Sequence, residues 1–88
     1  MEPNRIKLHA AYERSLADPL VADLVVASAH EVAERQGVAS PEVAVHPDHV
    51  ELSAPLPQAV LLSIAAELRK VTGRWHRAKF GTPLWRGE

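Results

Sequence analysis

The stretch VAVHPDHVEL, residues 43–52, has the pattern of a β-hairpin and decides the fold. Apolar residues alternate with others on both sides of Pro47-Asp48, at Val43, Val45, Val50 and Leu52. A two-residue loop at Pro47-Asp48 makes all four apolar side chains point to the same side of the two strands. Proline suits a type I turn, which twists less well into a tight hairpin, so a bulge or a shift of one residue is an alternative. We predict two antiparallel strands here.

A helix is predicted before this hairpin. Asp18 is a good N-cap, and Pro19 stands at the first helical position, where a missing N–H costs nothing. The residues that follow mark one apolar face at helical spacing: Leu20, Val21, Leu24, Val25, Ser28 and Val32. Gly37 can adopt the left-handed conformation that ends a helix, which predicts a helix of about 18 residues.

The outer parts of the chain supply three further elements. Residues 5–13 alternate as a half-buried strand does, although Leu8, Ala11, Tyr12 and Leu16 also fit helical spacing. A second helix follows Pro55-Leu56-Pro57 and is expected to stop at Gly73. Residues 74–80 alternate again and predict a last strand, which Gly81-Thr82-Pro83 interrupts.

The predicted order of elements is strand, helix, strand, strand, helix, strand. This order indicates an α+β fold, a two-layer sandwich of the ferredoxin-like βαββαβ type with both helices on one face of the sheet. The alternative is βαββα with an irregular C-terminal tail. We expect a single domain over 1–88, with its core in 5–80 and a tail at 81–88. RNA-recognition motifs share the element order, but their aromatic strand signature is missing here.

Composition limits the class of protein. The chain has 88 residues and no cysteine, its hydrophobic fraction is 47%, and its apolar runs are too short for a membrane span. No basic segment leads into an apolar stretch at the N-terminus, so we expect a cytoplasmic protein without membrane attachment. Seven arginines against three lysines hint at a thermophilic or GC-rich source.

Charge is distributed unevenly along the chain. Residues 1–68 carry a formal charge of minus six and residues 69–88 carry plus five. Three of the four aromatic residues, Trp75, Phe80 and Trp85, also lie in the last twenty positions. Such a segment suits nucleic acid, because cations neutralise phosphates and an aromatic ring can stack on an unpaired base. The preferred interpretation, however, is that the basic residues balance a helix end and the aromatic residues fill a core or a subunit contact.

The nucleic-acid hypothesis depends on the last strand. If residues 74–80 join the open face of the sheet, they make it basic and add an exposed indole. The predicted contact residues for RNA or DNA within segment 69–86 and on the first strand are Arg74, Trp75, Arg77, Lys79 and Lys7.

Three histidines form a second candidate site. Alternation places His9, His46 and His49 on the open face, where neighbouring strands would bring the imidazoles together. Three histidines and a water are a known zinc arrangement, so a metal site here is a hypothesis of lower rank. Protonation of His46 and His49 would place like charges opposite each other, which predicts sensitivity to pH.

Signals for catalysis are poor. The sequence has no cysteine nucleophile, nucleophile elbow, P-loop, dinucleotide-binding glycine pattern or zinc-protease motif. We therefore expect a non-catalytic binding or assembly domain without a cofactor or an identified small-molecule substrate. The surplus apolar surface of the second helix and the late aromatic residues predict a homodimer, with an interface at Leu62, Ala66 and Trp85.

Overall fold

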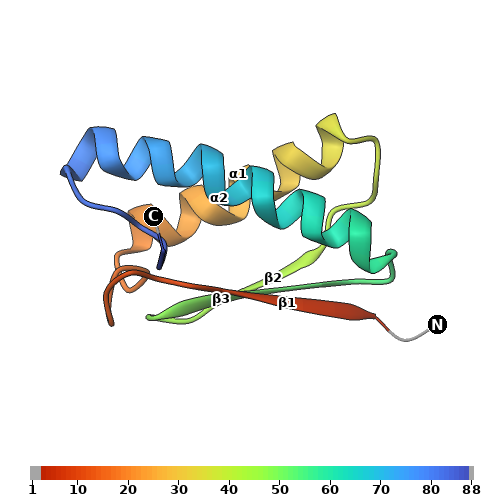
Figure 1. The fold of residues 1–88 in the computed structure, drawn as a ribbon, viewed down its shortest axis with the longest axis horizontal. Helices are drawn as coiled ribbons and strands as arrows, with labels where there is room; N and C mark the ends of the chain where they lie inside the picture. The colour runs from red at the N-terminus through yellow and green to blue at the C-terminus, as the bar shows by residue number, and fades with distance from the viewer. Residues whose placement is uncertain (1–2, 88) are drawn as a thin grey trace.

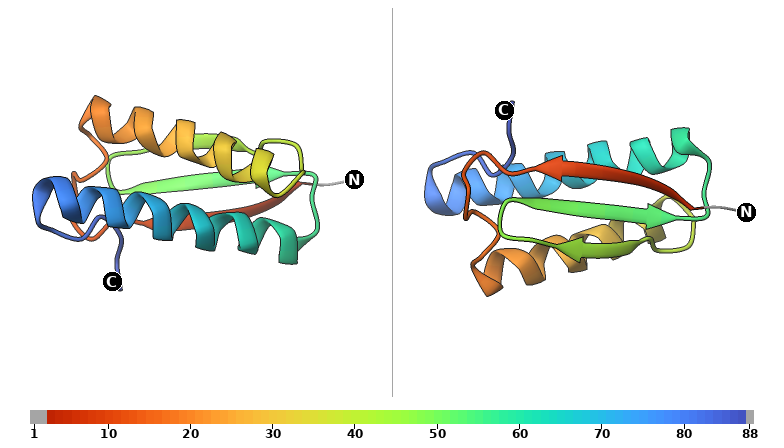
Figure 2. Two further views of the ribbon diagram at one scale, coloured as in Figure 1. Left: turned by 90° about the horizontal axis from the view of Figure 1, so that it is seen from above. Right: turned by 90° about the horizontal axis from the view of Figure 1, so that it is seen from below.

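The computed structural model describes residues 3–87 and contains two layers. The predicted domain and its tail extend into residues 1, 2 and 88, which lie outside this range. Both helices cover one face of a three-stranded antiparallel sheet of order β1-β3-β2, and the other face is open (Figures 1 and 2). The elements are β1 (Asn4–His9), α1 (Pro19–Arg35), β2 (Glu42–Val45), β3 (His49–Ala54) and α2 (Gln58–Phe80).

The hairpin forms in the register that the sequence predicts. Val45 pairs with Val50 and Val43 pairs with Leu52, so these side chains face the helices. The turn closes through the His46 N–H, which donates to the His49 carbonyl at 2.8 Å. Of the histidines predicted on the open face, His9 and His46 are exposed and His49 is half-buried. Val50 and Leu52, which face the helices, are fully buried.

Helix α1 begins and ends close to the predicted positions. The Asp18 side chain accepts a hydrogen bond from the Leu20 N–H at 2.9 Å, and Pro19 is the first helical residue. Gly37 has φ of 72°, and the Val38 N–H donates to the Ala33 carbonyl. This left-handed glycine turns the chain back toward the sheet.

Strand β1 is shorter than its alternation suggested. It pairs with β3 from Asn4 to His9, after which the chain turns away through residues 11–16. Tyr12 lies beyond the strand and is 57% exposed.

The predicted last strand is wrong, because α2 continues through residues 74–80. Gly73 does not stop the helix; it is buried and has no positive φ, whereas Gly81 has φ of 75° and its N–H donates to the Arg77 carbonyl. A glycine inside a helix costs only about 1 kcal/mol, which the packing of the following turn, including the buried His76, can offset. The order is therefore βαββα, the alternative named above, and the full ferredoxin-like order is not present in residues 3–87.

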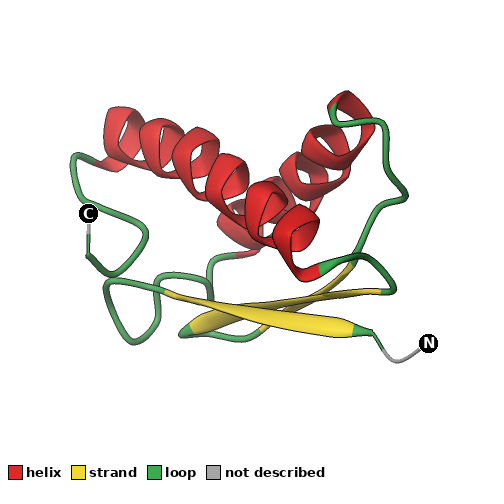
Figure 3. Cartoon of the chain, turned by 45° about the vertical axis from the view of Figure 1, so that its right-hand side comes forward, coloured by secondary structure: helices red, strands yellow, loops and turns green. Residues whose placement is uncertain are grey.

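The tail after α2 is anchored and returns to β1 (Figure 3). Trp85 is 1% exposed, and its Nε1–H donates to Thr72 Oγ1 at 3.0 Å. The tail runs antiparallel to the outer edge of β1: the Ala11 N–H donates to the Leu84 carbonyl at 2.8 Å and the Arg86 N–H to the His9 carbonyl at 2.9 Å. The tail therefore completes the core rather than hanging free.

The helices do not have the character of membrane spans. Neither of the two helices in residues 3–87 combines the length and the apolar composition that crossing a bilayer requires.

Candidate nucleic-acid interface

The C-terminal half of α2 carries a row of exposed cations, which we call the basic face: Lys70, Arg74 and Arg77. Spacings of four and three residues place these side chains on one side of the helix. The buried residues Leu68, Thr72 and His76 occupy the opposite side and hold the helix against the core. The position of the basic face is thus fixed by packing on the other side of the helix.

The cations of the basic face are not neutralised by neighbours. Among the described residues, none of the three makes an ion pair within 4 Å of a carboxylate. The acid nearest along the helix is Glu67, one turn before Lys70, and it is half-buried. In Figure 1 this part of α2 extends beyond the end of the sheet, so a partner can approach it from the solvent side.

Trp75 and Lys79 lie on a different side of α2 from the basic face. The Lys79 Nζ is 5.9 Å from the centroid of the Trp75 ring, a cation–π distance. The Trp75 ring packs edge-on against Phe80, with centroids 5.9 Å apart, and is half-buried against the core. Phe80 is 43% exposed. The helix therefore separates Arg77 from Trp75 and Lys79, which a strand would have placed on one side.

Lys7 lies on a different element from the basic face. It projects from β1 on the open face of the sheet, directly across from Glu51 on β3. The structure thus brings together Arg74 and Arg77 but places the fifth predicted contact residue, Lys7, elsewhere. The sequence prediction also omitted Lys70, which helical spacing from Arg74 and Arg77 could have identified.

The histidines gather on the open face as predicted. His46 and His49 stack with ring centroids 4.4 Å apart, and His9 lies 6.0 Å from His49. Nevertheless, within residues 3–87 no group of three or more His, Asp or Glu side chains is arranged to hold a metal ion. The cluster therefore gives no support to a metal centre.

Asp48 adds a charge to the histidine cluster. Its Oδ1 lies 2.7 Å from His49 Nδ1. This hydrogen bond to His49 is the main cause that lowers the pKa of the Asp48 carboxyl below its ordinary value, and the charge of His49 adds to it. The carboxylate form is the one that the turn favours.

The predicted dimer residues divide between two environments. Leu62 is 52% exposed and Ala66 is exposed, so both remain accessible. Trp85 was predicted at the same interface, but it belongs to the core of its own chain, where it contacts α2 and leaves almost no surface for a partner. Its partner Thr72 was not anticipated, because residues 13 positions apart give no periodic signal.

The Asp48–His49 pair predicts a specific pH response. A carboxyl whose pKa is lowered by folding stabilises the folded state at pH above its ordinary pKa, and this contribution disappears as the pH falls through the lowered pKa, below about pH 4. The substitution His49→Ala should raise the pKa of the Asp48 carboxyl, measured as the midpoint of its titration by carboxyl-carbon NMR. His46→Ala keeps the hydrogen bond and should leave it lowered. Identical midpoints in wild type and His49→Ala would refute the assignment.

Comparison with known proteins gives similarity in fold alone. No protein-family model matches the chain, and no curated protein matches it. Among solved structures, a protein from Deinococcus radiodurans described as a "putative transposase" has a TM-score of 0.71, with 22% sequence identity over 100% of this chain and 74% of that one. The α+β arrangement of a three-stranded antiparallel sheet under two helices therefore recurs in a solved structure.

Proposed function

We propose that this chain binds nucleic acid through the basic face of α2. The observation that carries the proposal is that Lys70, Arg74 and Arg77 project from one side of a packed helix, exposed and without ion pairs to the described residues. Lys70 and Arg77 are seven helical steps of about 1.5 Å apart, so the row is about 10 Å long. A row of this length can contact consecutive phosphates. The solved structure with a similar fold is named a putative transposase, a description that is consistent with nucleic-acid binding.

Phosphate contacts would dominate this interaction. Arginine and lysine neutralise phosphates without reading the bases. Trp75 is half-buried against Phe80 and the core, so its ring offers less of its surface to a base than an exposed aromatic does. We therefore expect binding to RNA and DNA with strong dependence on salt and weak dependence on sequence.

A salt titration tests the proposal. Binding of a fluorescent single-stranded RNA and of a duplex DNA should weaken as salt rises, with a logarithmic slope of about −2 to −3 for three phosphate contacts. The triple variant Lys70→Gln, Arg74→Gln, Arg77→Gln should lose most of the affinity, and Arg74→Gln alone should reduce the slope by about 1.

Arg14→Gln is the matched control, because Arg14 is exposed in the loop after β1, outside the basic face. It should bind like the wild type. No binding at low salt, or equal binding by the triple variant, would refute the proposal.

A second proposed function is assembly as a homodimer, and one groove favours it. A groove beside the outer edge of β1 has mostly apolar walls and two cations in its lining: Ile6, Lys7, Leu8, Leu62, Ala65, Ala66 and Arg69. Within residues 3–87, no strand pairs with that edge at Arg5 or Lys7. An unpaired edge with an apolar border can accept a strand from a second copy of the chain.

The oligomeric state tests this second function. Light scattering at tens of micromolar should return twice the mass of the chain, and Leu62→Glu should return the mass of one chain because a charge enters the groove. Leu20→Glu, at a similarly exposed leucine on α1, should remain dimeric. A monomeric wild type would contradict the dimer.

A further inference from the structure

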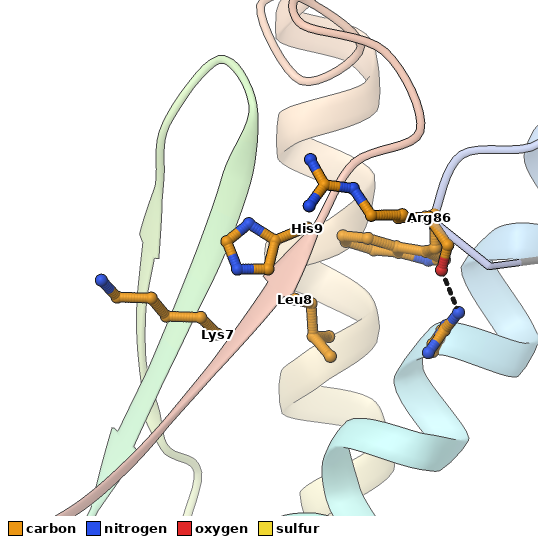
Figure 4. A pocket seen from close by; sticks show the side chains of 6 residues that line it. Lys7, Leu8, His9 and Arg86 are labelled. Atoms are coloured by element: carbon orange, nitrogen blue, oxygen red, sulfur yellow. Dashed lines mark hydrogen bonds between the residues drawn. The ribbon is translucent and has the colours of Figure 1, made fainter.

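A second cationic site lies away from the basic face, where the tail meets β1. A small pocket there is lined by Lys7, Leu8, His9, Arg69, Trp85 and Arg86 (Figure 4). Three of these six residues, Lys7, Arg69 and Arg86, carry a positive charge, and none is an acid. In a chain of net charge minus one, such a lining is a local excess of positive charge.

The backbone builds this site from three distant segments. The hydrogen bond from the Arg86 N–H to the His9 carbonyl places Arg86 beside His9 on the edge of β1. Arg69 from α2 donates through Nη2 to the Arg86 carbonyl, which fixes its guanidinium at the same place. Figure 4 shows the Arg86 guanidinium near the His9 ring, with Lys7 beyond it. Hydrogen bonds therefore hold the Arg86 backbone and the Arg69 guanidinium in place without a ligand.

Further groups favour an anion over a neutral ligand. Ala11 and His9 direct their backbone groups to the tail, so Lys7, two residues from His9, directs its N–H to the same edge, where no strand in residues 3–87 pairs with it. The nearby acid on the open face, Glu51, lies 3.8 Å from Arg5 and outside the pocket lining. Trp85 and Leu8 supply apolar walls, which strengthen the attraction between opposite charges.

The size of the pocket selects a small ligand. Its volume is about 180 Å³, below the 300–1,000 Å³ typical of sites for drug-sized molecules. A tetrahedral oxyanion with its waters fits this volume, and arginines bind phosphate through paired N–H donors.

We propose that this pocket binds a phosphate group, either free or at the end of a nucleic acid strand. Arg86 supplies the main charged donors from its guanidinium. Lys7 adds charge and His9 adds a ring N–H donor from the open face. Arg69 holds the Arg86 backbone and keeps the tail in position. The site is distinct from the basic face of α2. It can bind phosphate whether or not the basic face binds nucleic acid.

An NMR titration with inorganic phosphate tests the site at constant ionic strength, with chloride as the balancing anion. Saturable shifts are expected at the amides of Lys7, His9 and Arg86 and at the side-chain N–H groups of Arg69 and Arg86. Arg86→Gln should weaken binding by about tenfold, because it removes a charge-assisted hydrogen-bond donor. The double variant Lys7→Gln, Arg86→Gln should abolish saturation.

Two controls separate this site from general charge effects. Arg77→Gln, on the basic face, and Arg14→Gln, in the loop after β1, should both retain the phosphate affinity of the wild type. Preserved amide spectra elsewhere would establish that Arg86→Gln is folded. Phosphate shifts no larger than those with chloride, or equal weakening by Arg77→Gln and Arg86→Gln, would overturn the proposal.

The source of the phosphate is distinguished by a pair of oligonucleotides. A single-stranded DNA with a 5′-phosphate should bind more tightly than the same strand without it if the site takes a strand end, and Arg86→Gln should remove this difference. Equal binding of the two strands, together with saturable inorganic phosphate, assigns a free phosphate. Absence of both effects would overturn the site, while the Lys70, Arg74, Arg77 triple variant tests the basic face separately.

Discussion

The hydrogen bond between Trp85 and Thr72 is the interaction on which the C-terminal third of the structure depends. The indole is buried, and an unpaired buried donor costs about 1–3 kcal/mol, so its bond to Thr72 Oγ1 favours one position of the tail. Thr72 in turn donates to the Leu68 carbonyl at 2.6 Å. The tail is thereby held between α2 and β1, which places Arg86 beside His9.

This anchoring separates two cationic surfaces. One side of α2 packs Leu68, Thr72 and His76 into the core, which leaves Lys70, Arg74 and Arg77 in solvent. The tail returns to β1 and carries Arg86 to the other surface. The six basic residues of segment 69–86 thus do not form one patch. The helix sends three of them outward, and the tail delivers one to a pocket at the sheet edge.

Local patterns predicted the elements whose signals lie within a few residues. The hairpin register and the caps of α1 depend on neighbours, and both formed as expected. Residues 74–80 misled because their alternation fits a strand, while the spacing of Lys70, Arg74 and Arg77 fits a helix equally well. Which pattern prevails is decided by packing, because the continued helix buries His76 on the same side as Leu68 and Thr72. The pairing of Trp85 with Thr72 and of Arg86 with β1 is not periodic, so no sequence pattern announces it.

Hydrogen exchange at the junction between tail and sheet tests this account most directly. The Ala11 and Arg86 N–H groups donate across this junction, and the Trp85 indole N–H donates from the tail to Thr72 on α2. We expect all three to exchange far more slowly than an unstructured chain, and Thr72→Val to accelerate the indole and Arg86 together because both depend on the anchored tail. Exchange of Arg86 and the indole at the rate of an unstructured chain in the wild type would contradict the account.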